Sequence, residues 1–426
     1  MSTLQITGGR IVDPSQGIDR VGNLLIRGGR IVSFDDKSAL AERQIDARGK
    51  IVAPGLIDLH VSHREPGDNH EEHTASATAA ALAGGFTSIV CMPDTDPAID
   101  NRAAAEFVLL QAERARNCHV FPLGAITKRC EGKELAEIGQ LVEGGAMGFS
   151  DGIHPVANAE MMRRAMEYAA MFDRTIFALP QVPEMIEQGV MHEGFHSTLL
   201  GLKGMPATAE EIMVARDIAL AELAESRLHL MCLSTSGGLD LVRRAKRKGI
   251  RVSCEVTPHH LALTDESLRS FDSNYKVLPP LRPQEHIDAL LEGLKNGTID
   301  VIASDHQPFA SETKDRELDL VPFGIVGLET LLPICIKTLI EPGHLEWSAF
   351  LSRLTENPAK ILGIEKGTLQ PGCDADVTVI DPDSEYTIDS AQFRSHSSNT
   401  PFHGWKVKGR VETVMVNGEI RFSRNE

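Results

Sequence analysis

His60 and Ser62 stand at the end of one short apolar run, Ile57–Val61, where they could contribute to metal chemistry. Side chains two positions apart on a β-strand point to the same face, so two histidines at this spacing would direct two imidazoles at one ion. The second position here is a serine, and its hydroxyl does not replace a neutral imidazole as a zinc ligand. The pair therefore supplies one nitrogen ligand, and the rest of the chain decides whether this is a single loss.

The nearby histidines have simpler interpretations. We expect His63 to face away from His60 and to be a loop or packing histidine. His70 and His73 have the spacing of neighbours on one helix face. We interpret them as a polar cluster at a helix start, with a shared metal contact as the alternative.

Composition restricts the function classes. The chain has 426 residues, 42% hydrophobic and 24% charged, with a net charge of −17. This charge argues against nucleic-acid and anionic-membrane partners. No segment reaches the roughly 18 consecutive apolar residues of a membrane helix, and the first residues lack a basic, signal-like start. We expect a cytoplasmic protein. The basic run at residues 243–248 is interpreted as a solvated helix face, with a patch for an acidic partner as the alternative.

The cysteines indicate a reducing compartment. The chain has seven of them, an odd number, and none forms a C-x-x-C pair. Most lie in apolar runs and are expected to be buried and inert. They occupy positions 91, 118, 130, 232, 254, 335 and 373.

The two ends of the chain have the pattern of short β-strands joined by glycine turns. We therefore predict one small β domain built from residues 1–52 and 365–426, with residues 53–364 as a separate unit. The expected strands are Leu4–Val12, Asn23–Arg27, Arg30–Phe34, Asp376–Ile380, Val407–Val411 and Thr413–Phe422.

Between these ends, short apolar runs alternate with amphipathic helical segments, a pattern typical of a parallel (β/α)₈ barrel. A doubly wound open sheet is the alternative, but the chain has neither a GxGxxG turn after a first strand nor a Walker loop. The eight candidate strands are Ile57–Val61, Thr87–Met92, Val120–Ala125, Ala146–Phe149, Thr175–Leu179, Leu228–Leu233, Arg251–Val256 and Asp300–Ala303.

A series of motifs, in order along nearly the whole chain, resembles the dihydroorotases of the amidohydrolase superfamily, in particular the type that pairs with aspartate transcarbamoylase. This resemblance implies a TIM-like barrel with a terminal β domain. It also implies reversible, zinc-dependent cyclisation of N-carbamoyl-L-aspartate to dihydroorotate. The motifs are Pro54–His60, Arg64–Gly67, Met92–Pro97, Phe149–Asp151, Glu255–Leu261, Pro279–Arg282, Ser304–His306, Gly324–Glu329, Asn357–Lys360, Gly372–Asp376 and Gly404–Gly409.

By this resemblance, most of the metal ligands have been replaced. His60, Asp151 and Asp305 match ligand positions, and Asp305 also matches the general base. The other histidine positions of the family are occupied by Ser62, Leu179 and Cys232. A cysteine can bind zinc as a thiolate, so Cys232 is the one replacement that could rescue a site; an ordinary buried strand cysteine is the alternative.

The substrate-binding positions have changed in the same way. Arg64, which would clamp a carboxylate, is retained. Asp94 replaces an expected asparagine and would repel an anionic substrate, while Leu278 and Phe309 replace an asparagine and a histidine. Leucine and phenylalanine offer no hydrogen bond. The pocket therefore looks filled, although an apolar lining would also suit a different ligand.

These losses predict an inactive protein. Each lost catalytic group typically costs about 10²–10⁴ in rate, so combined losses should abolish the reaction. We expect no cofactor and a structural role as partner of aspartate transcarbamoylase. One alternative is an active zinc enzyme with a remodelled site, acting as a dihydroorotase or on a related cyclic amide. Another is a small-molecule sensor that uses Arg64.

Overall fold

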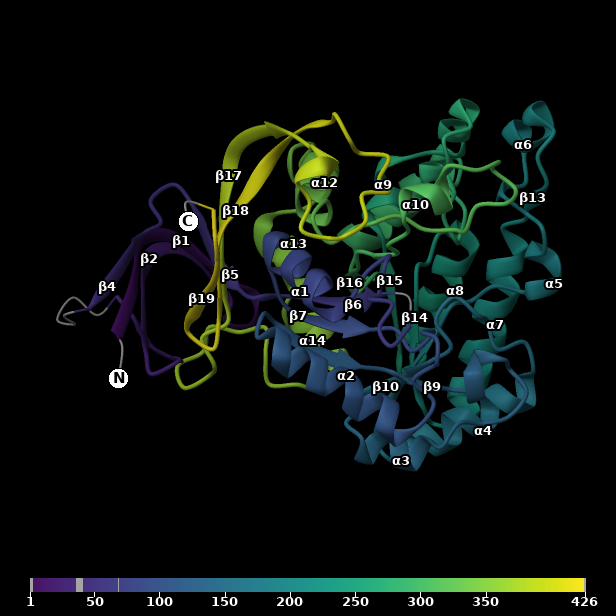
Figure 1. Ribbon diagram of the computed structural model, residues 1–426, viewed down its shortest axis with the longest axis horizontal. Helices are drawn as coiled ribbons and strands as arrows, with labels where there is room; N and C mark the ends of the chain where they lie inside the picture. The colour runs from purple at the N-terminus through teal and green to yellow at the C-terminus, as the bar shows by residue number, and fades with distance from the viewer. Residues whose placement is uncertain (1–2, 36–40, 68, 425–426) are drawn as a thin grey trace.

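A parallel barrel and a terminal β-sheet make up the computed structural model, which describes residues 3–35, 41–67 and 69–424. In Figure 1 the two ends of the chain, purple and yellow, lie together in one sheet on the left, and the barrel with its helices fills the right. The predicted fold class, a (β/α)₈ barrel with a β domain from both termini, is confirmed.

The terminal sheet has eight strands in the order β19-β18-β17-β5-β1-β2-β3, with β4 paired to β1. Its apolar core combines residues from both ends of the chain, such as Ile6, Leu24, Val379 and Met415. β5 crosses the predicted boundary after residue 52. It belongs to the terminal sheet, because it pairs with both β1 and β17. The strands are β1 (Thr3–Asp13), β2 (Ile18–Arg27), β3 (Arg30–Phe34), β4 (Arg43–Asp46), β5 (Ile51–Pro54), β17 (Val377–Thr387), β18 (Lys406–Val416) and β19 (Glu419–Ser423).

The barrel strands pair in parallel and in chain order, and β8 and β9 together form the third strand. The ring closes where the Ser62 N–H donates to the His306 carbonyl at 2.9 Å and the His306 N–H donates to the His60 carbonyl at 3.2 Å. The strands are β6 (Leu56–Val61), β7 (Phe86–Cys91), β8 (His119–Pro122), β9 (Gly124–Ala125), β10 (Gly148–Ser150), β11 (Thr175–Ala178), β14 (Arg227–Leu230), β15 (Val252–Val256) and β16 (Val301–Ile302).

The helices surround the barrel, and polar side chains mark where several of them begin. Asn101, Asn158 and Thr235 each accept a backbone N–H at the start of α2, α4 and α8. The longer helices are α1 (Thr74–Ala83), α2 (Arg102–Ala115), α3 (Ile138–Glu143), α4 (Ala159–Ala170), α6 (Phe195–Leu200), α7 (Thr208–Leu223), α8 (Ser236–Arg247), α10 (Gln284–Lys295), α13 (Trp347–Ser352) and α14 (Glu356–Leu362). Shorter ones are α5 (Pro183–Ile186), α9 (Pro258–Ala262), α11 (Ser311–Lys314) and α12 (Leu331–Cys335).

Two features differ from the sequence pattern. Residues 134–137 lie outside α3, because Lys128 and Ala136 form backbone hydrogen bonds that pair this segment with residues 126–128. Between β11 and β14 the chain adds α5 and α6 around a small parallel pair, β12 (Met191–His192) and β13 (Gly204–Met205). No helix in the described part of the chain is long and apolar enough to cross a membrane.

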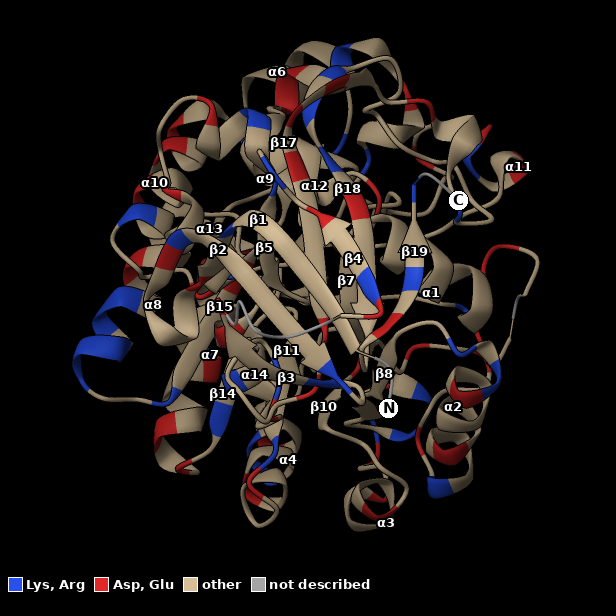
Figure 2. Ribbon diagram, turned by 90° about the vertical axis from the view of Figure 1, so that its left-hand side faces the viewer, with Lys and Arg blue, Asp and Glu red and all other residues tan. Residues whose placement is uncertain are grey.

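The basic run lies on α8 and just beyond it. In Figure 2, where the terminal sheet faces the viewer, blue segments follow this outer helix. Arg243 pairs with Asp240, and Lys246 pairs with Asp300. This agrees with the prediction of a solvated helix face.

The connection between β17 and β18 contacts the barrel. We call residues 388–405, between β17 and β18, the strap. Asn399 in the strap donates from Nδ2 to the carbonyls of Gln307 at 3.0 Å and Gly324 at 3.2 Å. Its Oδ1 accepts the Phe309 N–H at 3.1 Å. The strap therefore holds the loop that follows β16, where the candidate site lies.

Replacing Asn399 with alanine should lower the free energy of unfolding by about 2 kcal/mol, because a buried N–H and two carbonyls lose their partner. Urea denaturation followed by circular dichroism measures the shift. Ser398→Ala is the matched control, because the neighbouring Ser398 is exposed. Equal midpoints for the two variants would contradict the anchoring role.

Candidate functional site

The candidate site lies at the carboxyl ends of the barrel strands, the face that carries active sites in barrel enzymes. His60 lies on β6 and Glu255 on β15, while Cys232 and Asp305 come directly after β14 and β16. All four side chains are buried. Residues far apart in the sequence meet here because parallel strands end at the same rim.

The His60 ring lies between two carboxylates. Its Nδ1 is 2.8 Å from Oε1 of Glu255, and its Nε2 is 3.5 Å from Oδ1 of Asp305. Burial alone would lower the pKa of His60, but Asp305 and Glu255 together raise it to about 9. The two carboxylates therefore favour the protonated form of His60.

Glu255 is the centre of a second contact. Its Oε2 is 3.0 Å from Nε2 of His229, whose Nδ1 is 2.8 Å from the hydroxyl of Ser253. Burial raises the pKa of Glu255, but hydrogen bonds from His229 and His60 outweigh it and hold the pKa at about 2. Burial raises the pKa of Asp305 to about 6, against the lowering effect of His60. Both carboxylates are therefore ionised near neutral pH.

Cys232 completes the cluster as a thiol. Its Sγ is 3.4 Å from Nδ1 of His60 and 3.8 Å from Oε1 of Glu255. Burial raises the pKa of the Cys232 thiol well above its usual value, and the carboxylates of Asp305 and Glu255 raise it further. All seven cysteines of the chain are free, and only Cys373 is not buried.

The donor set around His60 differs from the zinc site that the resemblance implies. Among the described residues, one group of potential ligands has its donor atoms within 4.8 Å of one another: His60, Cys232 and Asp305. The sulfur lies beside Nδ1 of His60, which Glu255 already engages, whereas Asp305 lies beside Nε2. These residues do not fit the histidine-rich site that the resemblance implies. They supply at most three donors, as a single zinc ion at a catalytic site would need.

Three of the replaced positions lie in or against an apolar cluster in the barrel interior. Leu179 and Cys232 belong to it, together with Met92 and Phe177, and Leu278 packs against it. Leu179 is buried beside Phe177 and offers no hydrogen bond. Apolar side chains therefore occupy positions where the family resemblance places polar ones.

The predicted ligand Asp151 does not join His60. Its Oδ1 accepts the N–H groups of Ile126 at 2.8 Å and Thr127 at 2.9 Å, and its Oδ2 accepts the Thr127 hydroxyl. Burial raises the pKa of Asp151 to about 6, against these hydrogen bonds. Asp94 contacts the loop that follows Asp151, since its Oδ2 accepts the Ile153 N–H at 3.3 Å. Asp151 and Asp94 therefore accept backbone N–H groups and do not join the group formed by His60, Cys232 and Asp305.

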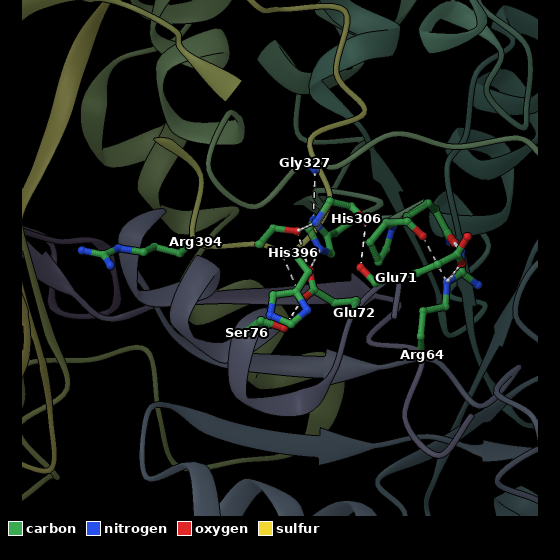
Figure 3. Close-up of polar contacts among 12 residues, drawn as sticks. Arg64, Glu71, Glu72, Ser76, His306, Gly327, Arg394 and His396 are labelled. Carbon is green, nitrogen blue, oxygen red and sulfur yellow. Dashed lines mark hydrogen bonds and ion pairs between the residues drawn. The ribbon is translucent and has the colours of Figure 1, made fainter. Parts of the chain in front are cut away.

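The Arg64 side chain is already engaged by neighbouring residues of the chain. Its guanidinium lies 4.5 Å from the centroid of the Phe309 ring, donates to Oε1 of Gln307 at 3.2 Å, and lies 3.7 Å from Oε2 of Glu71. Figure 3 shows Arg64 beside Glu71 at one side of the cluster around His306. The residue predicted to clamp a carboxylate already has a carboxylate and an aromatic face as partners.

The remaining histidines near the site have packing or capping contacts. Both nitrogens of His63 are buried without a hydrogen-bond partner, and burial lowers its pKa to about 4. His73 caps α1, where its Nδ1 accepts the Ser76 N–H at 2.9 Å. The Ser62 hydroxyl and Nε2 of His259 are also buried without a hydrogen-bond partner. The structure brings neither His63 nor His73 to the group around His60.

Sequence reasoning gave no role to three residues that organise the site. Glu255 and His229 form the hydrogen-bonded chain to His60, and Glu72 lies 3.5 Å from Nε2 of His306 while it accepts hydroxyls of the strap and α1. Figure 3 shows Glu72 between Ser76 and His306. Glu255 and His229 were detectable as polar residues inside apolar strand runs, but Glu72 depends on a contact with residue 395.

The fold and the polar rim define an amidohydrolase-type barrel. The L-hydantoinase (dihydropyrimidinase) from Arthrobacter aurescens has a TM-score of 0.90 at 27% identity, covering all of this chain and 97% of that one. The dihydropyrimidinase from Brevibacillus agri shares the fold, with a TM-score of 0.86 at 23% identity and 96% of that chain covered.

Sequence comparison identifies the family within this class of barrel proteins. A family model described as dihydro-orotase-like matches residues 49–237. The dihydroorotase of Geobacter metallireducens is 45% identical over 423 residues, covering 99% of this chain and all of that protein. The dihydroorotase of Acetivibrio thermocellus is 43% identical over 416 residues, or 97% of this chain and 98% of that protein. The chain belongs to the dihydroorotase family, as the motifs predicted.

In the native protein, Cys232 should resist alkylation at pH 7.5, because it is buried and its raised pKa keeps it a neutral thiol. Iodoacetamide followed by peptide mass spectrometry should label Cys373 first and Cys232 only after unfolding. Cys373→Ser is the control and should remove the fast-reacting thiol. Rapid native labelling of Cys232 would contradict its burial.

Proposed function

We propose that this dihydroorotase-family protein belongs to pyrimidine biosynthesis, is catalytically inactive, and serves as a structural partner of aspartate transcarbamoylase. The observation that carries the proposal is the apolar cluster inside the barrel, where Leu179 and Cys232 occupy ligand positions and Leu278 packs beside them. The family relationship supports the pathway, since the relatives that match nearly the whole chain bear the name dihydroorotase.

Loss of catalysis follows from the charges around His60. The reaction needs a Lewis acid to polarise an amide and a carboxylate to move a proton. Here Asp305 and Glu255 raise the pKa of His60, which favours the imidazolium form, and their carboxylates balance its charge. An imidazolium has no free lone pair, so a proton on His60 competes with a metal ion for this nitrogen ligand. This competition, together with the ion pair to Asp305, supports the loss of catalysis.

Substrate binding is weakened independently. N-carbamoyl aspartate carries two carboxylates that need fixed cations. Arg64 is occupied by Glu71, Gln307 and the Phe309 ring, so binding would require breaking these contacts. Asp94 adds a negative charge at a position where the family resemblance places an amide. Restoring the metal ligands alone would leave these obstacles in place.

A partner role is compatible with exposed apolar side chains on the loops at the strand ends, where the fold tolerates variation. Phe195 and Leu199 on α6 are 74% and 57% exposed, and Phe271, close by after a 3₁₀ turn that contacts α6, is 54% exposed. Exposed aromatic and aliphatic groups of this kind are common at the centres of protein interfaces.

The second candidate function is a cyclic amidohydrolase with one metal ion. The group formed by His60, Cys232 and Asp305 favours it, because its donor atoms lie within 4.8 Å of one another and a catalytic zinc needs three protein ligands and one open position. Elemental analysis of protein purified without chelators separates the two functions. About one tightly held zinc per chain would support this candidate over the inactive partner.

Dihydroorotase activity should be undetectable in both directions, and zinc should be well below one per chain. The variant Ser62→His/Leu179→His/Cys232→His may be loaded with zinc and assayed beside the unaltered chain. It should remain inactive, because the groups expected to bind the substrate are still replaced by Asp94, Leu278 and Phe309. Normal turnover in this variant would show that the metal ligands alone were limiting.

The chain should co-purify with aspartate transcarbamoylase from the same organism, since stable obligate interfaces bury on the order of 2,000 Å² or more. His60→Ala and Asp305→Ala should leave the complex intact, because both residues are buried. Phe195→Ser/Leu199→Ser should weaken it at least tenfold. Leu223→Ser is the matched control, an equally exposed side chain on α7. Separate elution from a fully active transcarbamoylase would overturn the proposal.

A further inference from the structure

A second pocket lies away from the strand ends, between the terminal sheet and the barrel helices. Its volume is about 270 Å³, and it is bounded by β17, β18, β19, α12 and the first part of the strap. Arg394, Arg410 and Arg424 line it, together with the aromatic residues Tyr386, Phe393 and Phe422. Neither the metal group nor the apolar cluster of the barrel contributes to its wall.

The three arginines bring positive charge to the pocket without a direct ion pair. Among the described residues, no carboxylate oxygen forms an ion pair within 4.0 Å of any of the three guanidinium groups. Arg410 lies 4.2 Å over the Tyr386 ring, and its Nε is buried with no hydrogen-bond partner. Arg424 donates from Nε to the Val411 carbonyl at 2.9 Å. Burial, and then the charge of Arg410, lower the pKa of Arg424.

The two acidic residues of the pocket do not neutralise these cations. Glu329 accepts the N–H groups of Arg394 at 2.8 Å and Ser395 at 3.2 Å, so its Oε1 is committed to the strap backbone. Burial raises the pKa of Glu329 to about 7, which leaves it partly neutral. Asp389 accepts the Ala391 N–H at 3.1 Å and the Gln392 side chain at 3.0 Å.

We propose that this pocket binds a small phosphate monoester that carries a planar ring, such as a nucleoside monophosphate. Guanidinium groups bind phosphate oxygens through paired hydrogen bonds, and the buried Nε of Arg410 is a donor without a partner. The aromatic walls suit the ring, and the volume suits a ligand of this size. The site uses side chains alone and needs neither a GxGxxG turn nor a Walker loop.

The ligand should also stabilise the strap. Arg394 extends away from the cluster around Glu72 and His306, as Figure 3 shows. The next residue, Ser395, donates its hydroxyl to Glu72 and its N–H to Glu329. A phosphate bound by Arg394 would therefore lie on the same segment that contacts the barrel rim. This inference goes beyond the proposed function and does not depend on the transcarbamoylase.

Isothermal titration calorimetry of the full chain with uridine monophosphate should detect binding, and uridine should bind at least tenfold more weakly. Arg410→Gln and Arg424→Gln should each weaken uridine monophosphate binding about tenfold or more, as expected for a lost charge-assisted hydrogen bond. Arg421→Gln is the control, because Arg421 lies on the neighbouring strand β19, pairs with Glu419 and does not line this pocket.

Hydrogen exchange gives a second readout. Uridine monophosphate should slow amide exchange in residues 389–396 of the unaltered chain and not in Arg424→Gln, a variant of an exposed residue that should fold normally. Circular dichroism checks the fold of each variant. The proposal is overturned if millimolar uridine monophosphate does not bind, or if Arg410→Gln and Arg424→Gln bind it as tightly as Arg421→Gln.

Discussion

The buried charge of His60 is the constraint around which the barrel rim is organised. An imidazolium in a low-dielectric interior is tolerated only beside opposite charge, and here Glu255 and Asp305 lie on its two nitrogen sides. Glu255 in turn needs His229, and His229 needs the Ser253 hydroxyl. The chain of contacts runs across β6, β14 and β15, so it also links three strands of the barrel.

The replaced positions have one physical consequence in common. Leu179 and Leu278 extend an apolar cluster toward the rim, and Phe309 covers the guanidinium of Arg64. Each replacement removes a polar group and adds contact area, which favours packing over solvation. Asp151 and Asp94, which remain acidic, turn to backbone N–H groups instead of an ion.

The strap makes the rim depend on the terminal sheet. It leaves β17, contacts Glu329 and Glu72, and returns to β18 after Asn399 has bound the loop that follows β16. Two domains that the sequence presents as separate β and α/β segments therefore share one buried polar network. The arginine pocket lies along the same segment, on the side away from the barrel strands.

The sequence by itself determined the barrel, the terminal sheet and the family. Strand and helix periodicity, glycine turns and residue types at motif positions are local properties, and all of them can be read along the chain. Through the resemblance to the family's motifs it also located His60, Cys232 and Asp305. The tertiary structure decided which partners these groups have. Glu255 meets His60 across 195 residues, and Ser395 meets Glu72 across 323. Such contacts depend on how strands close into a ring and how a connection crosses it, and no local pattern encodes that geometry.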